Sequence, residues 1–214
     1  MTDFITQALL FLPPFLLAIS FHESAHAYIA YRFGDPTARD MGRITLNPLP
    51  HIDILGLIML MTVHFGWAKP VMINPFNLRN PRKDNLWISL AGPVSNLILA
   101  IISAAVFRIL APFLVTTNGG LFFLQMIMMS VTLNIVLMVF NLFPLPPLDG
   151  FHILEGLVST DMYVKLQQVQ QVGPMILFGL ILLSYFTRIN IFSTIFNPIV
   201  RVLGGFLLGA SVGW

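Results

Sequence analysis

The sequence of 214 residues contains no cysteine and few charged side chains. Without cysteine the chain forms no disulfide, thiolate metal site or cysteine nucleophile, so any metal must bind histidine and carboxylate groups. Only 9% of the residues are charged, and the net charge of +2 arises from 11 basic and 9 acidic residues. The isoelectric point near 9.2 therefore reflects scarcity of charge, and no nucleic-acid partner is expected.

Apolar residues make up most of the chain. The hydrophobic fraction of 57% and the mean hydropathy of +0.84 lie outside the range of soluble globular proteins. The apolar N-terminus has no basic n-region or small-residue cleavage site, so it is interpreted as a retained helix rather than a signal peptide. Because no long polar linker divides the chain, we predict a single membrane domain over residues 1–214.

Five apolar stretches reach or approach the roughly 20 residues that a bilayer-spanning helix needs. Charged residues mark their ends: Arg32 follows the first stretch, and Arg188 separates the last two. The first three belong to a predicted catalytic core over about residues 4–157, and the last two form a C-terminal helix pair over about residues 170–212. The five stretches cover about residues 4–31, 86–111, 121–143, 170–187 and 190–212.

A sixth apolar stretch, residues 52–67, is shorter than a span and has basic residues on both sides. The positive-inside rule places both basic groups in the cytoplasm. A segment that enters the membrane and returns satisfies this rule, whereas a full span does not, so we expect a re-entrant segment. The preceding group is Arg32, Arg39 and Arg43, and the following group is Lys69, Arg79, Arg82 and Lys83.

Two similar Asn-Pro turns, residues 45–49 (TLNPL) and 72–76 (MINPF), flank this stretch. Residues before proline favour extended geometry, so we expect short β-strands near 42–47 and 69–74. Two ordinary turns at the membrane surface are the alternative. The predicted fold is therefore an all-α polytopic bundle of about five to six transmembrane helices, with the re-entrant segment and the short strands between helices 1 and 2.

The motif that carries chemistry is His22-Glu23-Ser24-Ala25-His26, inside the first apolar stretch. Residues i and i+4 share a helix face, so both imidazoles can bind one metal ion while Glu23 acts on a bound water. A chance match is the alternative. It leaves unexplained why His22, Glu23 and His26 lie in a lipid-embedded helix, where charged groups cost roughly 2.5 to 3.5 kcal/mol each. We therefore predict a metal site.

A third metal ligand must come from elsewhere in the chain, and Asp149 is favoured. It follows residues 141–148 (NLFPLPPL), where prolines break the end of an apolar helix and the freed backbone can line a polar cavity. The re-entrant topology also brings Asp149 to the side of the membrane on which His26 lies. The alternatives are a helix-capping role for Asp149 and Glu155 as the third ligand.

The HESAH motif and residues 141–150 (NLFPLPPLDG) together resemble the site-2 protease family of intramembrane zinc metalloproteases, specifically the short bacterial type without a PDZ or CBS domain. Phe151 and His152 depart from the pattern, because family members often carry glycine and a basic residue there. The resemblance covers about residues 18–157. Further matching segments are 42–53 (GRITLNPLPHID), 66–74 (GWAKPVMIN) and 91–96 (AGPVSN).

The resemblance implies one zinc ion per chain on His22, His26 and Asp149, with Glu23 as the base. It implies that Asn141 contacts the substrate backbone, and that the substrate is a transmembrane segment of a single-pass protein, cleaved in or beside the lipid bilayer. The expected location is the cell membrane, as a multi-pass protein with its active site toward the cytoplasm.

Two asparagines are candidates for work on the substrate. Asn141, and with weaker support Asn96, could donate hydrogen bonds to the developing oxyanion or hold the substrate strand. The alternative for both is hydrogen bonding between helices by a buried asparagine.

Two other functions compete with proteolysis. Intramembrane histidines and carboxylates also mark ion pathways, so a metal-ion transporter or sensor is one alternative, although neither needs Glu23 as a base. A non-catalytic scaffold descended from a protease is the other, and the complete set of base and ligands argues against it.

Three weaker signals remain. Residues 209–213 (GASVG) match the G-x-S-x-G motif of serine hydrolases but lack its strand-turn-helix context. We instead expect the glycines that recur every four residues here, Gly205, Gly209 and Gly213, to form a helix-packing face and a homo-oligomer contact. His51 and Asp53 either support the metal site or are solvated at the interface, and the solvated role is preferred.

Overall fold

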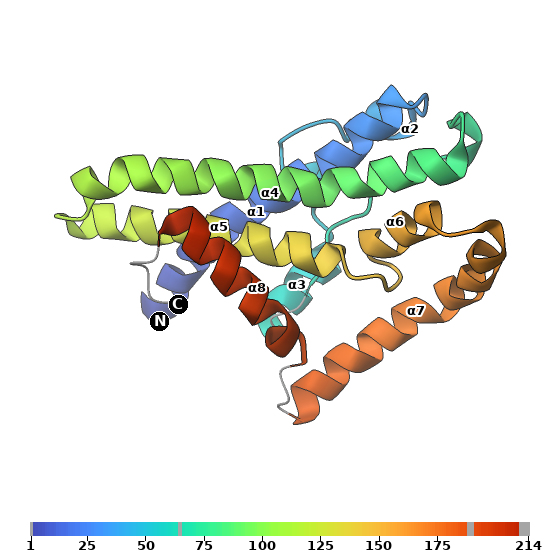
Figure 1. The fold of residues 1–214 in the computed structure, drawn as a ribbon. Coiled ribbons are helices and arrows are strands. Elements are labelled where there is room, and N and C mark those ends of the chain that lie inside the picture. The colour runs from blue at the N-terminus through green and yellow to red at the C-terminus, as the bar shows by residue number, and fades with distance from the viewer. Residues whose placement is uncertain (1, 64–65, 188–190, 210–214) are drawn as a thin grey trace.

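The chain forms a bundle of long helices with short elements inserted after the first (Figure 1). A computed structural model describes residues 2–63, 66–187 and 191–209. The elements are α1 (Thr2–Arg32), α2 (Thr37–Asp40), η1 (Leu49–His51), α3 (Ile54–Val63), η2 (Pro75–Asn77), α4 (Pro81–Leu114), α5 (Asn118–Asn141), α6 (Asp149–Leu157), α7 (Thr160–Thr187) and α8 (Ile191–Leu208).

Helices α4 and α5 form an antiparallel hairpin along which α1 packs (Figure 1). Asn80 caps the start of α4 by accepting a hydrogen bond from the Lys83 N–H, and Thr117 caps α5 by accepting one from the Gly120 N–H. The turn between the two helices is tight, because a Cβ on Gly120 would lie 2.1 Å from the Leu114 carbonyl oxygen.

The apolar core lies where α8 crosses the α4–α5 hairpin. Its buried members include Ala100, Val131 and Ile135 from the hairpin and Phe196 and Val200 from α8. Helix α7 contacts the start of α4, where Arg82 lies over the Tyr163 ring, but most of it lies away from the hairpin (Figure 1) and exposes most of its side chains. The predicted C-terminal helix pair therefore contains one helix that is part of the core and one that is peripheral.

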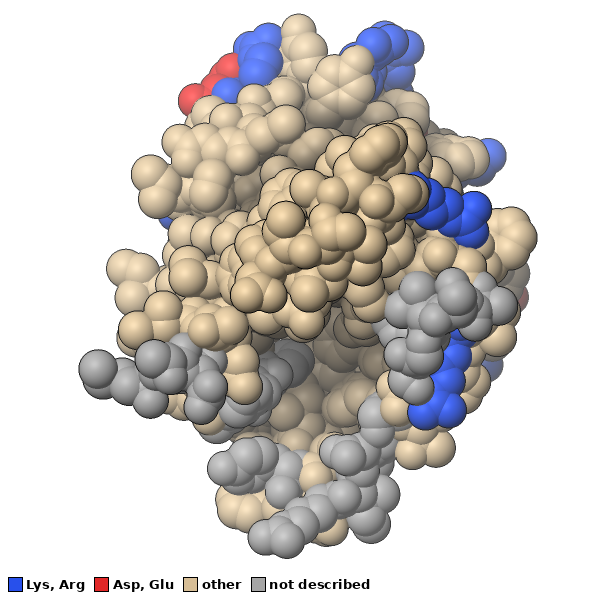
Figure 2. All heavy atoms as spheres, turned by 90° about the vertical axis from the view of Figure 1, so that its left-hand side faces the viewer, with Lys and Arg blue, Asp and Glu red and all other residues tan. Residues whose placement is uncertain are grey.

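Four of the described helices are long and apolar enough to cross a membrane: α1, α4, α5 and α7. Within α8, residues Thr194–Leu208 form a shorter apolar helix. Figure 2 shows a face dominated by uncharged residues, with Lys and Arg side chains toward its edges. These features confirm the predicted all-α, multi-pass membrane fold, although the fifth predicted span is shorter than expected and its last residues lie outside the described part.

The stretch 52–67 ends beside the point where it begins. Its helix α3 has ten residues, or about 15 Å at 1.5 Å per residue, half the roughly 30 Å of a hydrocarbon core. Its ends lie side by side, since Ile52 forms an antiparallel bridge with Ala68 and the Lys69 N–H donates to the His51 carbonyl at 2.8 Å. The stretch therefore returns to the place where it begins, as the sequence predicted, and its entry into the membrane stays a prediction.

The prediction of short strands near 42–47 and 69–74 was wrong. In the described ranges the sole β-type pairing outside helices is the isolated bridge. The amides of the Asn-Pro turns bond their own backbone instead: Asn47 accepts from the Leu49 N–H, and Asn74 accepts from the Phe76 N–H. Such local bonds compete with a backbone ladder, so these segments are held by side chains.

Candidate metal centre

Two imidazoles on α1 form the helical half of the site. His22 and His26 are one turn apart and both are buried, so their rings lie on the face of α1 that meets α4 and α6. Their Nε2 atoms are 2.9 Å apart. The i and i+4 spacing therefore produces the convergence that the sequence predicted.

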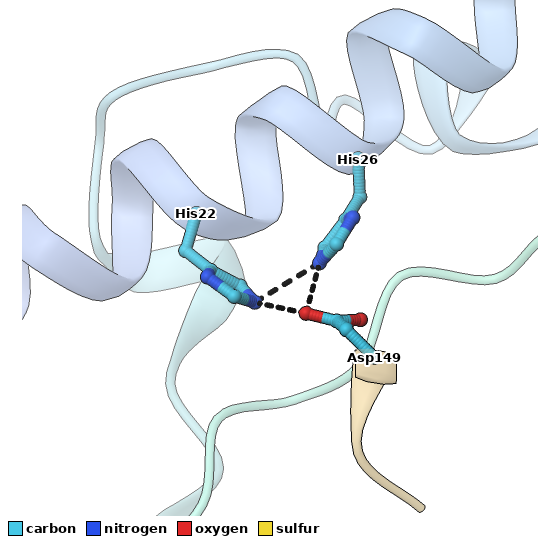
Figure 3. A group of neighbouring side chains, drawn as sticks. All are labelled: His22, His26 and Asp149. Carbon is cyan, nitrogen blue, oxygen red and sulfur yellow. Dashed lines mark hydrogen bonds and ion pairs between the residues drawn. The ribbon is translucent and has the colours of Figure 1, made fainter. Parts of the chain in front are cut away.

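The third member, Asp149, is the first residue of α6. Prolines between α5 and α6 interrupt the helix and turn the chain back toward α1. The Oδ2 atom of Asp149 lies 3.1 Å from His22 Nε2 and 3.3 Å from His26 Nε2 (Figure 3). The structure thus unites the three residues that the sequence proposed as metal ligands.

The chemistry of these three atoms fits a bound cation. The Nδ1 atom of His26 lies 2.7 Å from the Ile88 carbonyl oxygen; because a carbonyl only accepts, Nδ1 carries the proton and the neutral ring presents a lone pair at Nε2. Asp149 Oδ2 is buried and accepts no hydrogen bond. Electron-rich atoms this close repel one another unless a cation lies among them, and two histidines with one carboxylate suit a catalytic zinc.

Gly92 of α4 provides the space beside these atoms. A Cβ at this position would lie 2.4 Å from His26 Nε2 and 2.6 Å from His22 Nε2. Any other residue would therefore push into the space between the two Nε2 atoms. The bare backbone at Gly92 fits a site that must hold an ion.

The predicted base, Glu23, lies beside a buried arginine that the sequence did not single out. Arg43 is 2% exposed, and its Nη2 atom lies 3.9 Å from Glu23 Oε2. The same guanidinium donates to the carbonyl oxygens of Lys69 and Pro70. Burial lowers the pKa of Arg43 and the Glu23 carboxylate opposes that effect, but an arginine remains charged. Arg43 therefore joins the re-entrant connection to the surroundings of Glu23.

The two candidate asparagines have different surroundings. Asn96 is fully buried, and its Oδ1 atom lies 2.7 Å from His22 Nδ1. Asn141, the last residue of α5, is half-buried, and its amide nitrogen donates to the Leu137 carbonyl of its own helix at 3.0 Å. Asn96 is thus placed next to a candidate ligand, His22, which matches the alternative of bonding between helices.

Glu155, the alternative third ligand, and the weaker candidates lie outside the cluster of His22, His26 and Asp149. Glu155 binds His152 and Gln167 instead. Asp53 accepts from the Gly56 N–H at the start of α3. His51 has no exposed surface and bonds the Thr45 carbonyl at 2.9 Å, so the preferred solvated role for His51 was wrong. Ser211 of the G-x-S-x-G match lies outside the described residues.

Sequence reasoning missed Gly92 and Arg43. A glycine inside an apolar helix is unfavourable by roughly 1 kcal/mol relative to alanine, so the Gly-Pro pair at 92–93 was a usable signal of close approach. A single arginine in a loop carried no such signal, because its burial depends on where the loop folds.

Comparisons with known proteins place the chain among metalloproteases. The family model described as peptidase family M50 matches residues 114–184, which include Asp149. YwhC of Bacillus subtilis, designated a zinc metalloprotease, is 40% identical over an alignment of 202 residues, and the match covers 86% of this chain and 91% of that protein. The similarly designated Rip2 of Mycolicibacterium smegmatis is 30% identical over 179 residues, covering 81% of this chain and 66% of Rip2.

A second Rip2, from Mycobacterium tuberculosis, is 34% identical over 147 residues. The match covers 65% of this chain and 54% of that protein, so the chain spans about half the length of this relative. Solved structures gave no significant match.

Proposed function

Because the chain belongs to peptidase family M50, as its 40% identity over nearly the whole of YwhC shows, we propose that His22, His26 and Asp149 hold the catalytic zinc of an intramembrane metalloprotease. The observation that carries the proposal is the meeting of three ligand atoms from α1 and α6 within 3.3 Å. The membership also favours proteolysis over the metal-transporter alternative. The protein is a multi-pass membrane protein that acts on membrane proteins within the bilayer.

Glu23 is the proposed general base. When bound, zinc supplies Lewis acidity that acidifies a water molecule and polarises a peptide carbonyl. Glu23 takes a proton from the attacking water, whose oxygen bonds to the carbonyl carbon. As the carbon–nitrogen bond breaks, Glu23 returns the proton to the leaving nitrogen, so the products are a carboxylate terminus and an amine terminus.

Asn141 is the proposed contact for the substrate backbone. It ends α5 immediately before the proline-broken connection to Asp149. Within the described residues, the Asn141 amide nitrogen donates to the Leu137 carbonyl of its own helix. Its Oδ1 atom can therefore accept a hydrogen bond from a substrate N–H. The substrate we propose is a transmembrane segment of a single-pass protein, which must unwind locally to expose a peptide bond.

The active site is proposed to face the cytoplasm of a cell membrane. The end of the molecule with the site is also the basic end: α1 finishes at Arg32 and α4 begins with Arg82 and Lys83. The positive-inside rule assigns such an end to the cytoplasm.

Single cysteines introduced into the cysteine-free chain test this orientation. A membrane-impermeant maleimide added to intact spheroplasts should label Thr116→Cys and leave Asp40→Cys unlabelled until lysis, and the reverse pattern would overturn the orientation.

We also propose that α8 contacts a second copy through Gly205. A Cβ at Gly205 would meet no atom within 4 Å, so this part of α8 has room for a neighbour. The face is shorter than the sequence suggested, because Gly209 has a φ of 95° just after α8 ends, and Gly213 lies outside the described residues. Light scattering in detergent should detect a dimer that Gly205→Leu converts to monomer, and a monomeric wild type would remove this proposal.

The functional test compares wild type, Glu23→Gln and Asp149→Asn. Purified protein is analysed for zinc and then incubated with a panel of transmembrane peptides. Wild type should contain about one zinc per chain and cleave at least one peptide. Glu23→Gln should keep the zinc and lose cleavage by at least about 100-fold, the lower range for a general base. Asp149→Asn should lose both.

Two results would contradict the proposal. If Asp149→Asn retained full zinc content, Asp149 would not be a ligand. If Glu23→Gln cleaved peptides at the wild-type rate, the base would be another residue. Asp161→Asn is the matched control for Asp149→Asn, since Asp161 is an exposed residue of α7.

A further inference from the structure

A chain of buried amides connects His22 to the interior of the helix bundle. His22 Nδ1 contacts Asn96 Oδ1 at 2.7 Å, and Asn96 Nδ2 contacts Asn134 Oδ1 at 2.9 Å. Both asparagines have no exposed surface. The three residues come from α1, α4 and α5, so the contact crosses three helices at the depth of the site.

The orientation of Asn134 is determined by a backbone carbonyl. Its amide nitrogen lies 2.8 Å from the Ser130 carbonyl oxygen, one turn earlier in α5. A carbonyl can only accept, so the NH₂ group must point at Ser130. The oxygen of Asn134 must then point at Asn96.

The orientation of Asn96 follows from that of Asn134. Its amide nitrogen faces two acceptors, Asn134 Oδ1 at 2.9 Å and the Ala18 carbonyl oxygen at 3.3 Å. Reversing the amide would set its oxygen against both of them. Asn96 Oδ1 is therefore the atom that faces His22, and only a protonated Nδ1 can share a hydrogen bond with it.

We propose that Asn96 and Asn134 are positioning residues that set the tautomer of His22, so that its Nε2 lone pair faces the metal centre. The ring nitrogen that binds a metal is determined by the hydrogen bond of the other nitrogen. His26 obtains the same orientation from the Ile88 carbonyl, which no side-chain substitution removes. His22 instead depends on two amides from neighbouring helices.

This inference rests on the proposed metal role of His22, and it gives Asn96 a role distinct from substrate binding. Substrate contact requires an amide that can reach a substrate, whereas Asn96 has no exposed surface and its polar atoms are engaged by His22, Ala18 and Asn134. Loss of Asn96 should therefore weaken zinc binding even when no substrate is present.

The test measures zinc affinity by competition with a chelating dye on full-length protein in detergent. Asn96→Leu should weaken zinc binding by roughly 10- to 100-fold, the usual effect of removing a group that orients a metal-binding histidine. Asn134→Leu should weaken zinc binding less, because the Ala18 carbonyl still accepts from the Asn96 amide and only part of the protein then carries a reversed Asn96. Ser103→Ala is the control, since Ser103 bonds Ser130 and does not orient either amide.

Asn96→Asp tests whether zinc affinity depends on the hydrogen-bond acceptor that orients His22 or on the folding of the protein. A neutral carboxyl group can donate its O–H to Asn134 Oδ1 or to the Ala18 carbonyl, the two acceptors that the Asn96 amide faces, while its other oxygen accepts from His22 Nδ1. Asn96→Asp should therefore retain zinc affinity, and it should also remove the effect of Asn134→Leu in the double variant. The ¹⁵N spectrum of histidine-labelled, chelator-treated protein should show His22 protonated at Nδ1 in wild type and a mixed population in Asn96→Leu.

The outcomes are distinguishable. If wild type bound no zinc, or bound it independently of His22, the proposed function would fail. If wild type bound zinc but Asn96→Leu had unchanged affinity and an unchanged His22 tautomer, the positioning role would be rejected while the function stood. Equal losses in Asn96→Asp and Asn96→Leu would likewise reject it, because the acceptor would not be what matters.

Discussion

At the scale of single residues, the proposed metal site depends on the absence of a side chain at Gly92 as much as on its three proposed ligands. Gly92 brings the backbone of α4 against the Nε2 atoms of His22 and His26. A methyl group there would contact the far ends of two side chains rather than rigid backbone. The imidazoles can swing aside at little cost to the fold, but they would then no longer converge.

Gly92→Ala should therefore eliminate zinc binding and leave the protein folded. Alanine favours a helix by about 1 kcal/mol over glycine, so the melting temperature in detergent should not fall. Metal analysis should show zinc decreasing from about one per chain to near zero. Gly179→Ala is the control, because a Cβ at Gly179 of α7 would meet no atom within 4 Å. Full zinc content in Gly92→Ala would contradict this role.

At the scale of elements, the connection between α1 and α4 is organised by buried charged side chains. Asp35 has no exposed surface. Its carboxylate accepts from the Thr37 N–H, the Asn74 N–H at 2.7 Å and the Asn77 amide at 2.9 Å. It thereby joins the end of α1 to the segment that precedes α4.

The stability contributed by Asp35 should depend on pH. Burial raises the pKa of Asp35, but the hydrogen bonds from Asn77, Thr37 and Asn74 outweigh burial and hold that pKa below its ordinary value. A depressed pKa stabilises the fold above the unfolded-state value of about 3.9, and this contribution disappears as pH falls through the folded-state pKa.

Asp35→Asn should accordingly have a lower melting temperature than wild type at pH 7. The difference between the two melting temperatures should narrow as the pH falls below about 4. Thermal unfolding in detergent across this pH range measures the gap. Asp40→Asn is the matched control, since the Asp40 side chain is 59% exposed and pairs with Arg39 at the surface. A gap that stayed constant with pH would show that the ionised form of Asp35 is not what stabilises the connection.

At the scale of the whole molecule, the core and the active site share two helices. Helices α4 and α5 supply Gly92, Asn96 and Asn134 to the site and also form the apolar cluster with α8. Phe196 of α8 is buried there and meets Phe140 edge-to-face at a centroid distance of 6.0 Å. Helix α8 therefore supports the hairpin that positions His22.

Phe196→Ala should destabilise the protein by about 3–5 kcal/mol, the usual cost of truncating a buried phenylalanine. Phe178→Ala on α7 is the matched control, because Phe178 is 49% exposed and its loss leaves no cavity. Unfolding of both variants in detergent gives the comparison. Equal stability of the two variants would mean that α8 contributes no more to the fold than α7 does.

The main features of the fold and site followed from local sequence signals. The long apolar stretches predicted the helices, because a lipid solvent requires uninterrupted intrahelical hydrogen bonds. The charge distribution around residues 52–67 predicted the re-entrant course. HESAH placed His22 and His26 on one helix face, and the prolines before Asp149 marked the point where a helix stops at membrane depth.

The sequence alone determined which residues have metal-binding chemistry, because ligand type and helical spacing are local properties. The tertiary structure decided what surrounds them. That Gly92 opens space, that Arg43 approaches Glu23 and that Asn96 faces His22 depend on how α1, α4, α5 and the loops pack. Such contacts join residues far apart in the chain, and their geometry arises only when close packing and hydrogen bonding are satisfied together.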